Sequence, residues 1–180
     1  SPAAQTHINE AIAAGVMTSN ADNAQLTYQT VATFAAPFYV GFVVNSRLDF
    51  QPADTFVKAL KGEKGPFGVD PRLQKMIAPK GTSISAVANN SYTPSSNLND
   101  YVGMPYGVTN PEAPKQIENN RTSNFSNAVL RADASLTFME YAEVEFLLSE
   151  ANNWNQTNYL NGIKASMENW GVSTSDIATY

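Results

Sequence analysis

The stretch that decides the fold runs from Thr137 to Gly171 and reads TFMEYAEVEFLLSEANNWNQTNYLNGIKASMENWG. Its first half opens with a capping pattern, because Thr137 can cap free amide groups and Glu140 can reach back to the cap's own amide. Apolar residues then crowd the following turns: Phe138, Tyr141, Ala142, Val144, Phe146, Leu147 and Leu148. This half predicts an amphipathic helix that begins at Thr137 and ends at the asparagine-rich break over 152–156.

The second half predicts another amphipathic helix, with Thr157 as its cap and Gly171 in the left-handed turn that closes it. Its apolar residues recur at steps of four, four and three, which places them on one helix face: Tyr159, Ile163, Met167 and Trp170. The two halves together predict an αα-hairpin over 137–171, the unit of which helical-repeat proteins are built.

The composition of the chain excludes several classes of function. The 180 residues have a net charge of -5 and no cysteine, and only 15% of them are charged. The negative balance argues against nucleic acid, whose phosphates need a basic patch. The lack of cysteine excludes disulfides and thiolate chemistry, and a single histidine, His7, makes a typical zinc site implausible. We expect no metal site.

The rest of the chain predicts three further regions of one partial domain spanning 1–180: a helical start at 6–14, a core over 26–79 and a long irregular segment over 81–135. In the core, the apolar run from Pro37 to Val44 predicts either a buried helix opened by the proline or a buried strand pair. A short helix is expected from Asp54, its cap, to Gly62, its end. A turn at Asp70, stabilised by Arg72, is expected to lead into a short extended piece that ends near Pro79.

Four motifs in order carry a family resemblance: DPRL at 70–73, YVGMPYG at 101–107, EYAEVEFLLSEA at 140–151 and GIKASMENWGV at 162–172. Together they resemble the SusD-like branch of the SusD/RagB family. The resemblance implies a lipoprotein on the extracellular face of the outer membrane in Bacteroidetes. It implies a protein that binds an oligosaccharide or polysaccharide and serves as the lid of a TonB-dependent SusC-like transporter. It also implies a mostly α fold of tetratricopeptide-like helix hairpins, with long irregular loops that carry the ligand site. It implies no catalysis and no cofactor.

Family members are much longer than this chain, and the lipid anchor that would attach them to the membrane lies outside it. A single αα-hairpin also cannot bury both of its apolar flanks. We therefore expect the chain to be a fragment of a larger α domain, or to pack against another copy.

The irregular segment 81–135 is the expected ligand surface. Aromatic rings match the flat C–H faces of sugars, and amides, carboxylates and cations match the hydroxyls. The candidate glycan-binding residues are Tyr92, Asn97, Asn99, Asp100, Tyr101, Tyr106, Arg121 and Trp154. For Tyr101 and Tyr106 we favour a packing role that fixes the loop to the core. Trp154 is expected to fold back over the end of the hairpin if it does not bind a ligand.

Two alternatives remain. The first is a helical-repeat adaptor that binds a protein along an exposed groove of Tyr159, Ile163 and Met167. The second is a glycoside hydrolase, which needs two carboxylates across a cleft, and Asp100 and Glu112 are its only loop candidates. The glutamates of the hairpin are expected to be solvated or structural, and Glu145, which has apolar neighbours, is the candidate for a buried, paired carboxylate.

Overall fold

The computed structural model describes residues 2–47, 50–109, 111–112, 115 and 121–180, and its fold is mostly α. Its single sheet, within those residues, pairs β1 (Ala24–Thr27) with β2 (Ser135–Met139). Contacts group the chain into two compact units: Ser1–Leu26 with Thr137–Thr174, here unit 1, and Thr27–Leu136 with Ser175–Tyr180, here unit 2. The expectation of one domain remains a prediction.

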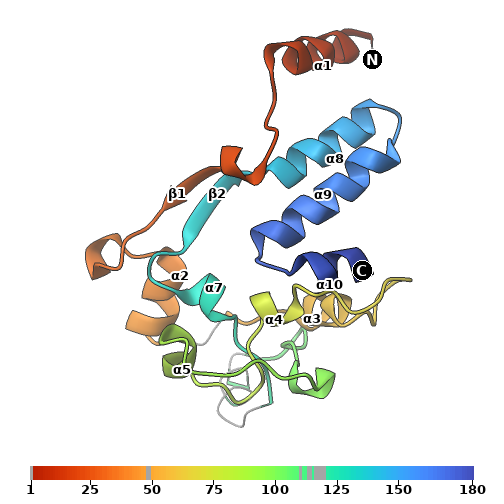
Figure 1. Cartoon of the computed structure of the whole chain (residues 1–180). Helices are drawn as coiled ribbons and strands as arrows, with labels where there is room; N and C mark the ends of the chain where they lie inside the picture. The colour runs from red at the N-terminus through yellow and green to blue at the C-terminus, as the bar shows by residue number, and fades with distance from the viewer. Residues whose placement is uncertain (1, 48–49, 110, 113–114, 116–120) are drawn as a thin grey trace. The chain divides into compact units, whose positions relative to one another are not determined.

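Unit 1 contains the predicted αα-hairpin. Helices α8 (Tyr141–Ala151) and α9 (Gln156–Asn169) lie antiparallel and side by side, drawn in blue in Figure 1. Gly171 has a φ of 66°, so it closes α9 in the left-handed conformation that the sequence predicted. The unit also holds α1 (Pro2–Ala14), which confirms the helical start, and the 3₁₀ helix η1 (Asn20–Asp22).

The predicted caps of the hairpin are wrong. Thr137 lies in β2, where its backbone is committed to strand pairing, and α8 begins four residues later. The first amide of α8, on Tyr141, instead donates to Oδ1 of Asn23 at 2.7 Å. Asn155 caps α9 in place of Thr157, because its side chain accepts from the Asn158 amide at 3.1 Å.

The contact between the two hairpin helices depends on a glycine and a buried carboxylate. A Cβ on Gly162 would lie 2.7 Å from the Phe146 ring, so α9 approaches that ring only because position 162 has no side chain. Glu145 is buried, as predicted, and accepts from the Tyr141 hydroxyl at 2.6 Å and from Nδ2 of Asn158 at 2.8 Å. The hairpin glutamates therefore include one that stabilises the scaffold from within.

Unit 2 is built from short helices and loops. Its helical elements are α2 (Pro37–Tyr39), the π-helix η3 (Val40–Val44), α3 (Asp54–Leu60), α4 (Leu73–Met76), α5 (Ile84–Ala88), α7 (Asn127–Leu130), the 3₁₀ helices η2 (Ala32–Phe34) and η4 (Leu98–Asp100), and all but the first residue of α10 (Thr174–Thr179). Two small apolar clusters form its core. One gathers Val57, Leu60, Leu73, Ile77 and Tyr101, and the other gathers Phe42, Ala78, Val87 and Leu130.

The helix alternative for the run from Pro37 to Val44 is correct and the strand pair is wrong, although the run continues as a π-helix and only Phe42 within it is buried. Asp54 is the first residue of α3 and not its cap, and it pairs with Lys58 at 2.7 Å. The piece predicted as extended after Arg72 is the short helix α4. Leu73 and Ile77 are buried and four residues apart, which fits one helical turn, and the extended bias before Pro79 applies only to Ala78.

The turn at Asp70 is held as predicted. The Arg72 guanidinium donates to both carboxylate oxygens of Asp70, with a shortest N–O distance of 2.6 Å, and the Arg72 amide donates to Oδ1 at 2.8 Å. Hydrogen bonding to Asp70 raises the pKa of Arg72 above its ordinary value. Because Asp70 is buried, this bidentate pair is structural and not a ligand site.

Candidate carbohydrate-binding surface

The irregular segment is fixed to unit 2 by Tyr101. This residue is 0% exposed, and its hydroxyl donates to the Ser95 carbonyl at 2.9 Å and accepts from the Ser95 amide at 2.9 Å. Burial raises the pKa of Tyr101, which keeps the hydroxyl protonated as a donor. Tyr101 thus has the packing role that we favoured, and its ring is closed to a ligand.

A glycine makes the next contact of this loop possible. A Cβ on Gly103 would lie 2.5 Å from the Asp54 Cα, so the loop backbone packs directly on the start of α3. Ala53 and Met104 form a bridge at the same place. The YVGMPYG motif is therefore architectural over 101–104.

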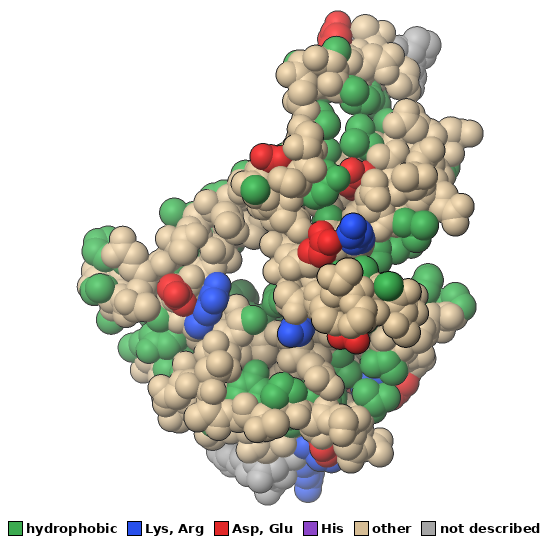
Figure 2. All heavy atoms as spheres, viewed as in Figure 1, with side chains coloured by type: hydrophobic (Ala, Val, Ile, Leu, Met, Phe, Trp, Pro, Cys, Tyr) green, Lys and Arg blue, Asp and Glu red, His purple; other side chains and the backbone are tan. Residues whose placement is uncertain are grey.

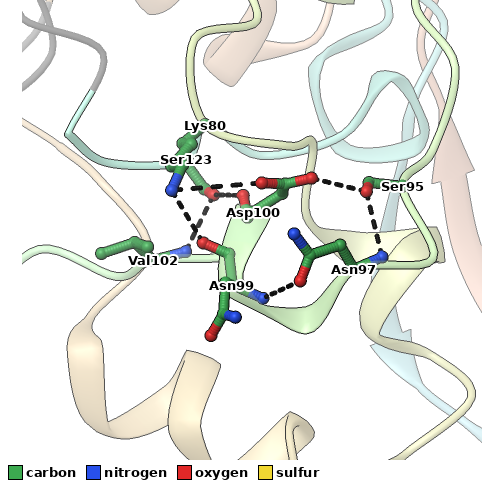
Figure 3. A network of polar contacts seen from close by, with 7 residues as sticks. All are labelled: Lys80, Ser95, Asn97, Asn99, Asp100, Val102 and Ser123. Atoms are coloured by element: carbon green, nitrogen blue, oxygen red, sulfur yellow. Dashed lines mark hydrogen bonds and ion pairs between the residues drawn. The ribbon is translucent and has the colours of Figure 1, made fainter.

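A polar network fixes the residues around η4 (Figure 3). The Ser95 hydroxyl donates to Oδ2 of Asp100 at 2.6 Å, and Nζ of Lys80 lies 4.0 Å from Oδ1 of the same carboxylate. Lys80 also donates to the Asn99 carbonyl at 2.9 Å. The buried Ser123 hydroxyl joins the network by accepting from the Val102 amide at 3.1 Å.

Three of the predicted binding residues take part in this network. Asn97 caps η4, because its side chain accepts from the Asn99 amide at 3.1 Å, but its side chain is exposed. Asn99 is also exposed. Its backbone carbonyl accepts from Lys80, and its side-chain amide remains at the surface. Asp100 is half-buried and hydrogen-bonded, which suits a role in shaping the surface.

Beside this network lies a shallow polar hollow around Tyr92, here called the Tyr92 hollow. Its volume is about 270 Å³, and it is lined by Gln74, Lys75, Asn90, Tyr92, Pro94, Ser126, Asn127, Ala128 and Arg131. The Tyr92 ring packs on the core cluster of Phe42, and its hydroxyl accepts from the Asn127 amide at 3.3 Å. The ring is thereby held at a fixed orientation while part of it remains exposed.

The chemistry of the Tyr92 hollow suits a polyhydroxylated ligand. One aromatic ring offers a face for C–H groups, amides offer donors and acceptors, and Lys75 and Arg131 offer charged donors. The described lining residues include no carboxylate. Arg131 is paired with Asp133, with 3.5 Å between Nε and Oδ1, so the hollow is only weakly cationic. Charged side chains are few and scattered over the face drawn in Figure 2, and that face offers no extended basic patch for a polyanion such as nucleic acid.

The other predicted residues are not among those that line the hollow. Tyr106 is 76% exposed and its hydroxyl lies 3.3 Å from Oγ1 of Thr55, so the predicted packing role is wrong for this tyrosine. Arg121 is exposed in unit 2. Trp154 belongs to unit 1 and is 73% exposed with a φ of 61°, so it does not fold back over the hairpin.

Sequence reasoning missed most of the hollow's lining. Gln74 and Lys75 come from α4, and Asn127 and Arg131 come from α7 and its end, about fifty residues further along the chain. Only packing brings these elements together, so spacing in the sequence carries no signal for them. Asn90 could have been found, because the pair Asn89-Asn90 is a turn signal in the sequence. In the structure Asn90 has a φ of 51°, the left-handed conformation that asparagine tolerates.

The candidate metal ligands and the two hydrolase carboxylates can be placed within the described residues. Among the residues that the structure describes, no group of three His, Asp or Glu side chains stands close enough to hold a metal ion. His7 is exposed, and its Nδ1 lies 3.1 Å from Oε2 of Glu10. Of the two hydrolase candidates, Asp100 accepts from Ser95, and Glu112 pairs with Lys115 at 2.7 Å.

No helix within the described ranges has the length and apolarity that a membrane span requires. No protein with a curated description matches the chain. A family model does match, over residues 1–180, and its family is a SusD-like one described as "Starch-binding associating with outer membrane".

The chain is similar in fold to larger solved structures. A protein described as chitin-binding has a TM-score of 0.69 at 22% identity, with 99% of this chain and 39% of that one covered. A SusD homologue from Bacteroides fragilis NCTC 9343 has a TM-score of 0.67 at 21% identity, and the match covers 97% of this chain and 39% of that one. A SusD-like protein from Bacteroidetes has a TM-score of 0.67 at 20% identity, and the match covers 99% of this chain and 46% of that one. The chain thus spans less than half the length of each.

Proposed function

We propose that this chain, which belongs to the SusD-like family, captures an oligosaccharide on the extracellular face of the outer membrane and passes it to a SusC-like TonB-dependent transporter. The protein is a binding protein and not an enzyme. Family membership supports an outer-membrane location and a carbohydrate ligand at the level of the family's description. The hand-off and the extracellular face are proposals that go beyond it.

The observation that carries the proposal is the Tyr92 hollow. A tyrosine ring fixed by a backbone amide stands among amide and cationic donors, on the segment that the sequence already favoured. Ligand sites commonly combine one apolar face with a few convergent polar groups in this way. The Tyr92 ring is already held in place, so binding loses little side-chain entropy there. Because the hollow is small and open to solvent, we expect a dissociation constant in about the micromolar to millimolar range.

In the proposed mechanism a sugar ring stacks on Tyr92 while its hydroxyls bond the amides of Asn90 and Asn127. Lys75 and Arg131 donate to hydroxyls at the rim. Asn97, Asn99 and Asp100 extend the polar surface next to the hollow, because Gln74 of the hollow donates to the Ser95 carbonyl at 3.0 Å. An oligosaccharide can therefore contact the hollow and the η4 network together.

One observation favours a second function, protein binding by unit 1. A cavity of about 610 Å³ between α1 and α8 is lined largely by apolar side chains, among them Ile8, Ile12 and Leu147. Figure 2 shows hydrophobic side chains gathered there. The groove that we predicted for this function does not form as expected, because Met167 is fully buried. An apolar cavity of this kind suits a helix of a partner or of a longer chain.

A glycan array followed by calorimetric titration tests the proposal. Maltohexaose and chitohexaose are the first probes, since the family is described as starch-binding and one structural neighbour as chitin-binding. Saturable binding of at least one oligosaccharide is expected. If no glycan of a broad array binds, and an amphipathic peptide binds in its place, unit 1 carries the function and the carbohydrate proposal is wrong.

A further inference from the structure

A second pocket in unit 2 is separate from the Tyr92 hollow and has different chemistry. It has a volume of about 210 Å³ and is lined by Pro37, Phe38, Gly41, Phe42, Arg47 and Phe50. Three of these six residues are phenylalanines. Phe38 is 53% exposed and Phe50 is 52% exposed, although both would gain from burial. We call this site the phenylalanine pocket.

The rings of the phenylalanine pocket are arranged around an open place. The buried Phe42 ring lies 6.0 Å from the Phe38 ring and 6.4 Å from the Phe50 ring, centroid to centroid. Phe125 contacts Phe42 edge-on from behind, at 6.1 Å and 88°. Such tilted and edge-on pairs are the preferred geometry of aromatic clusters. Since Phe38, Phe42 and Phe50 line the same pocket, a further ring bound in it can contact them.

The backbone around the pocket adds a second observation. Gly41 lies in the π-helix η3, a rare element that is frequent at functional sites. A Cβ on Gly41 would meet nothing within 4 Å, so the pocket keeps open space where any other residue would place a side chain. The Arg47 guanidinium lies 4.9 Å from the Phe50 centroid, which adds a cation–π contact at the rim.

The geometry points to a site for the six-membered aromatic ring of a small ligand. An apolar cavity of about 150 Å³ already holds benzene, so about 210 Å³ suits a monocyclic ring with a small substituent. Aromatic pairing adds an attraction that a saturated ring of the same size lacks. The site is independent of the Tyr92 hollow, and it recognises an aromatic group and not a sugar.

Ligand-observed NMR titration tests the inference with benzyl alcohol as probe and cyclohexylmethanol as its saturated counterpart. We expect saturable binding of benzyl alcohol with a dissociation constant of about a millimolar, and binding of cyclohexylmethanol at least threefold weaker. Equal binding of the two alcohols contradicts the aromatic class. Displacement of benzyl alcohol by methyl glucoside would overturn the separation from the sugar site.

Two variants locate the probe. Gly41→Leu fills the open space and is expected to abolish binding. Gly68→Leu is its matched control, because Gly68 also has open space around its Cβ position, needs no positive φ and lies outside the pocket. Phe38→Leu keeps an apolar surface and removes one ring, so it should weaken benzyl alcohol about threefold and leave cyclohexylmethanol unchanged. Undiminished binding to a folded Gly41→Leu variant refutes the assignment.

Discussion

The hydroxyl of Tyr101 makes two hydrogen bonds to the backbone of Ser95, one to its carbonyl and one from its amide, each 2.9 Å long. The tyrosine is fully buried, so the pair connects the hydrophobic core directly to the segment that carries Tyr92 and Asn97. Tyr101, which was predicted as a candidate ligand contact, thus stabilises the candidate surface from the core side.

Replacing Tyr101 by phenylalanine is expected to lower the free energy of unfolding by about 1–3 kcal/mol, because the Ser95 amide and carbonyl lose their partner. Urea denaturation measures the change. Tyr106→Phe is the matched control and should stay within about 0.5 kcal/mol, since Tyr106 is exposed. Equal effects of the two substitutions would contradict the anchoring role of Tyr101.

Arg72→Ala leaves the buried Asp70 carboxylate without its bidentate partner. The expected loss of unfolding free energy is about 3 kcal/mol, as for other broken buried pairs. The comparison is Lys164→Ala, which breaks an exposed 3.7 Å pair with Glu168 and should cost at most about 0.5 kcal/mol. A cost for Arg72→Ala as small as that of Lys164→Ala would show that the turn does not depend on the pair.

Stability should depend on the ionisation of Tyr141 at high pH. The hydrogen bond to Glu145 raises the pKa of Tyr141 to about 12, from an ordinary value of 10.0. A pKa raised by folding means that the protonated hydroxyl is favoured in the folded state. Its contribution is therefore complete below pH 10 and is lost as the pH rises from 10 to about 12.

Chemical denaturation of the unmodified chain and of Tyr141→Phe, at pH 8 to 12, measures this dependence. The difference in unfolding free energy between the two proteins should be constant below pH 10 and shrink above it. The subtraction removes the titration of the other tyrosines and of the lysines. A difference that stays constant to pH 12 would mean that Glu145 does not hold the hydroxyl.

Gly103→Ala is expected to destabilise the chain by about 1–3 kcal/mol, because the new Cβ would overlap backbone atoms of Asp54 and Ala53 that cannot move independently. Gly68→Ala introduces the same methyl group into open space and should be neutral or slightly stabilising. Thermal unfolding monitored by circular dichroism compares the two, and a melting temperature of Gly103→Ala equal to that of Gly68→Ala would contradict the close packing.

The sequence predicted helices well where a periodic apolar face decides them. The hairpin and its closing Gly171 follow from local spacing and from the need for a positive φ. The start of α8 does not, because its first amide is satisfied by Asn23, which lies 118 residues earlier in the chain. Local capping rules therefore predicted Thr137 as the cap, although its backbone lies in β2.

The candidate surface was predictable by region and less by residue. Composition pointed to 81–135, and Tyr92 and Asn97 do expose polar or aromatic surface there. Tyr101 and Tyr106 share one motif but have opposite environments, since only tertiary packing decides which ring is buried. Lys75 and Asn127 came from helices outside or at the end of the segment, where no local pattern marked them.

The central claim, that the Tyr92 hollow binds carbohydrate, is tested most directly by calorimetric titration of the best oligosaccharide from the array into the chain and into Tyr92→Leu. Leucine keeps the packing of position 92 on the core and removes the stacking face. Tyr39→Leu, outside the described pockets, is the matched control. Tyr92→Leu should weaken binding about tenfold, or about 1.4 kcal/mol, with Tyr39→Leu unchanged. Unaltered affinity of a folded Tyr92→Leu protein, or a loss confined to Tyr106→Leu or Trp154→Leu, would contradict the claim.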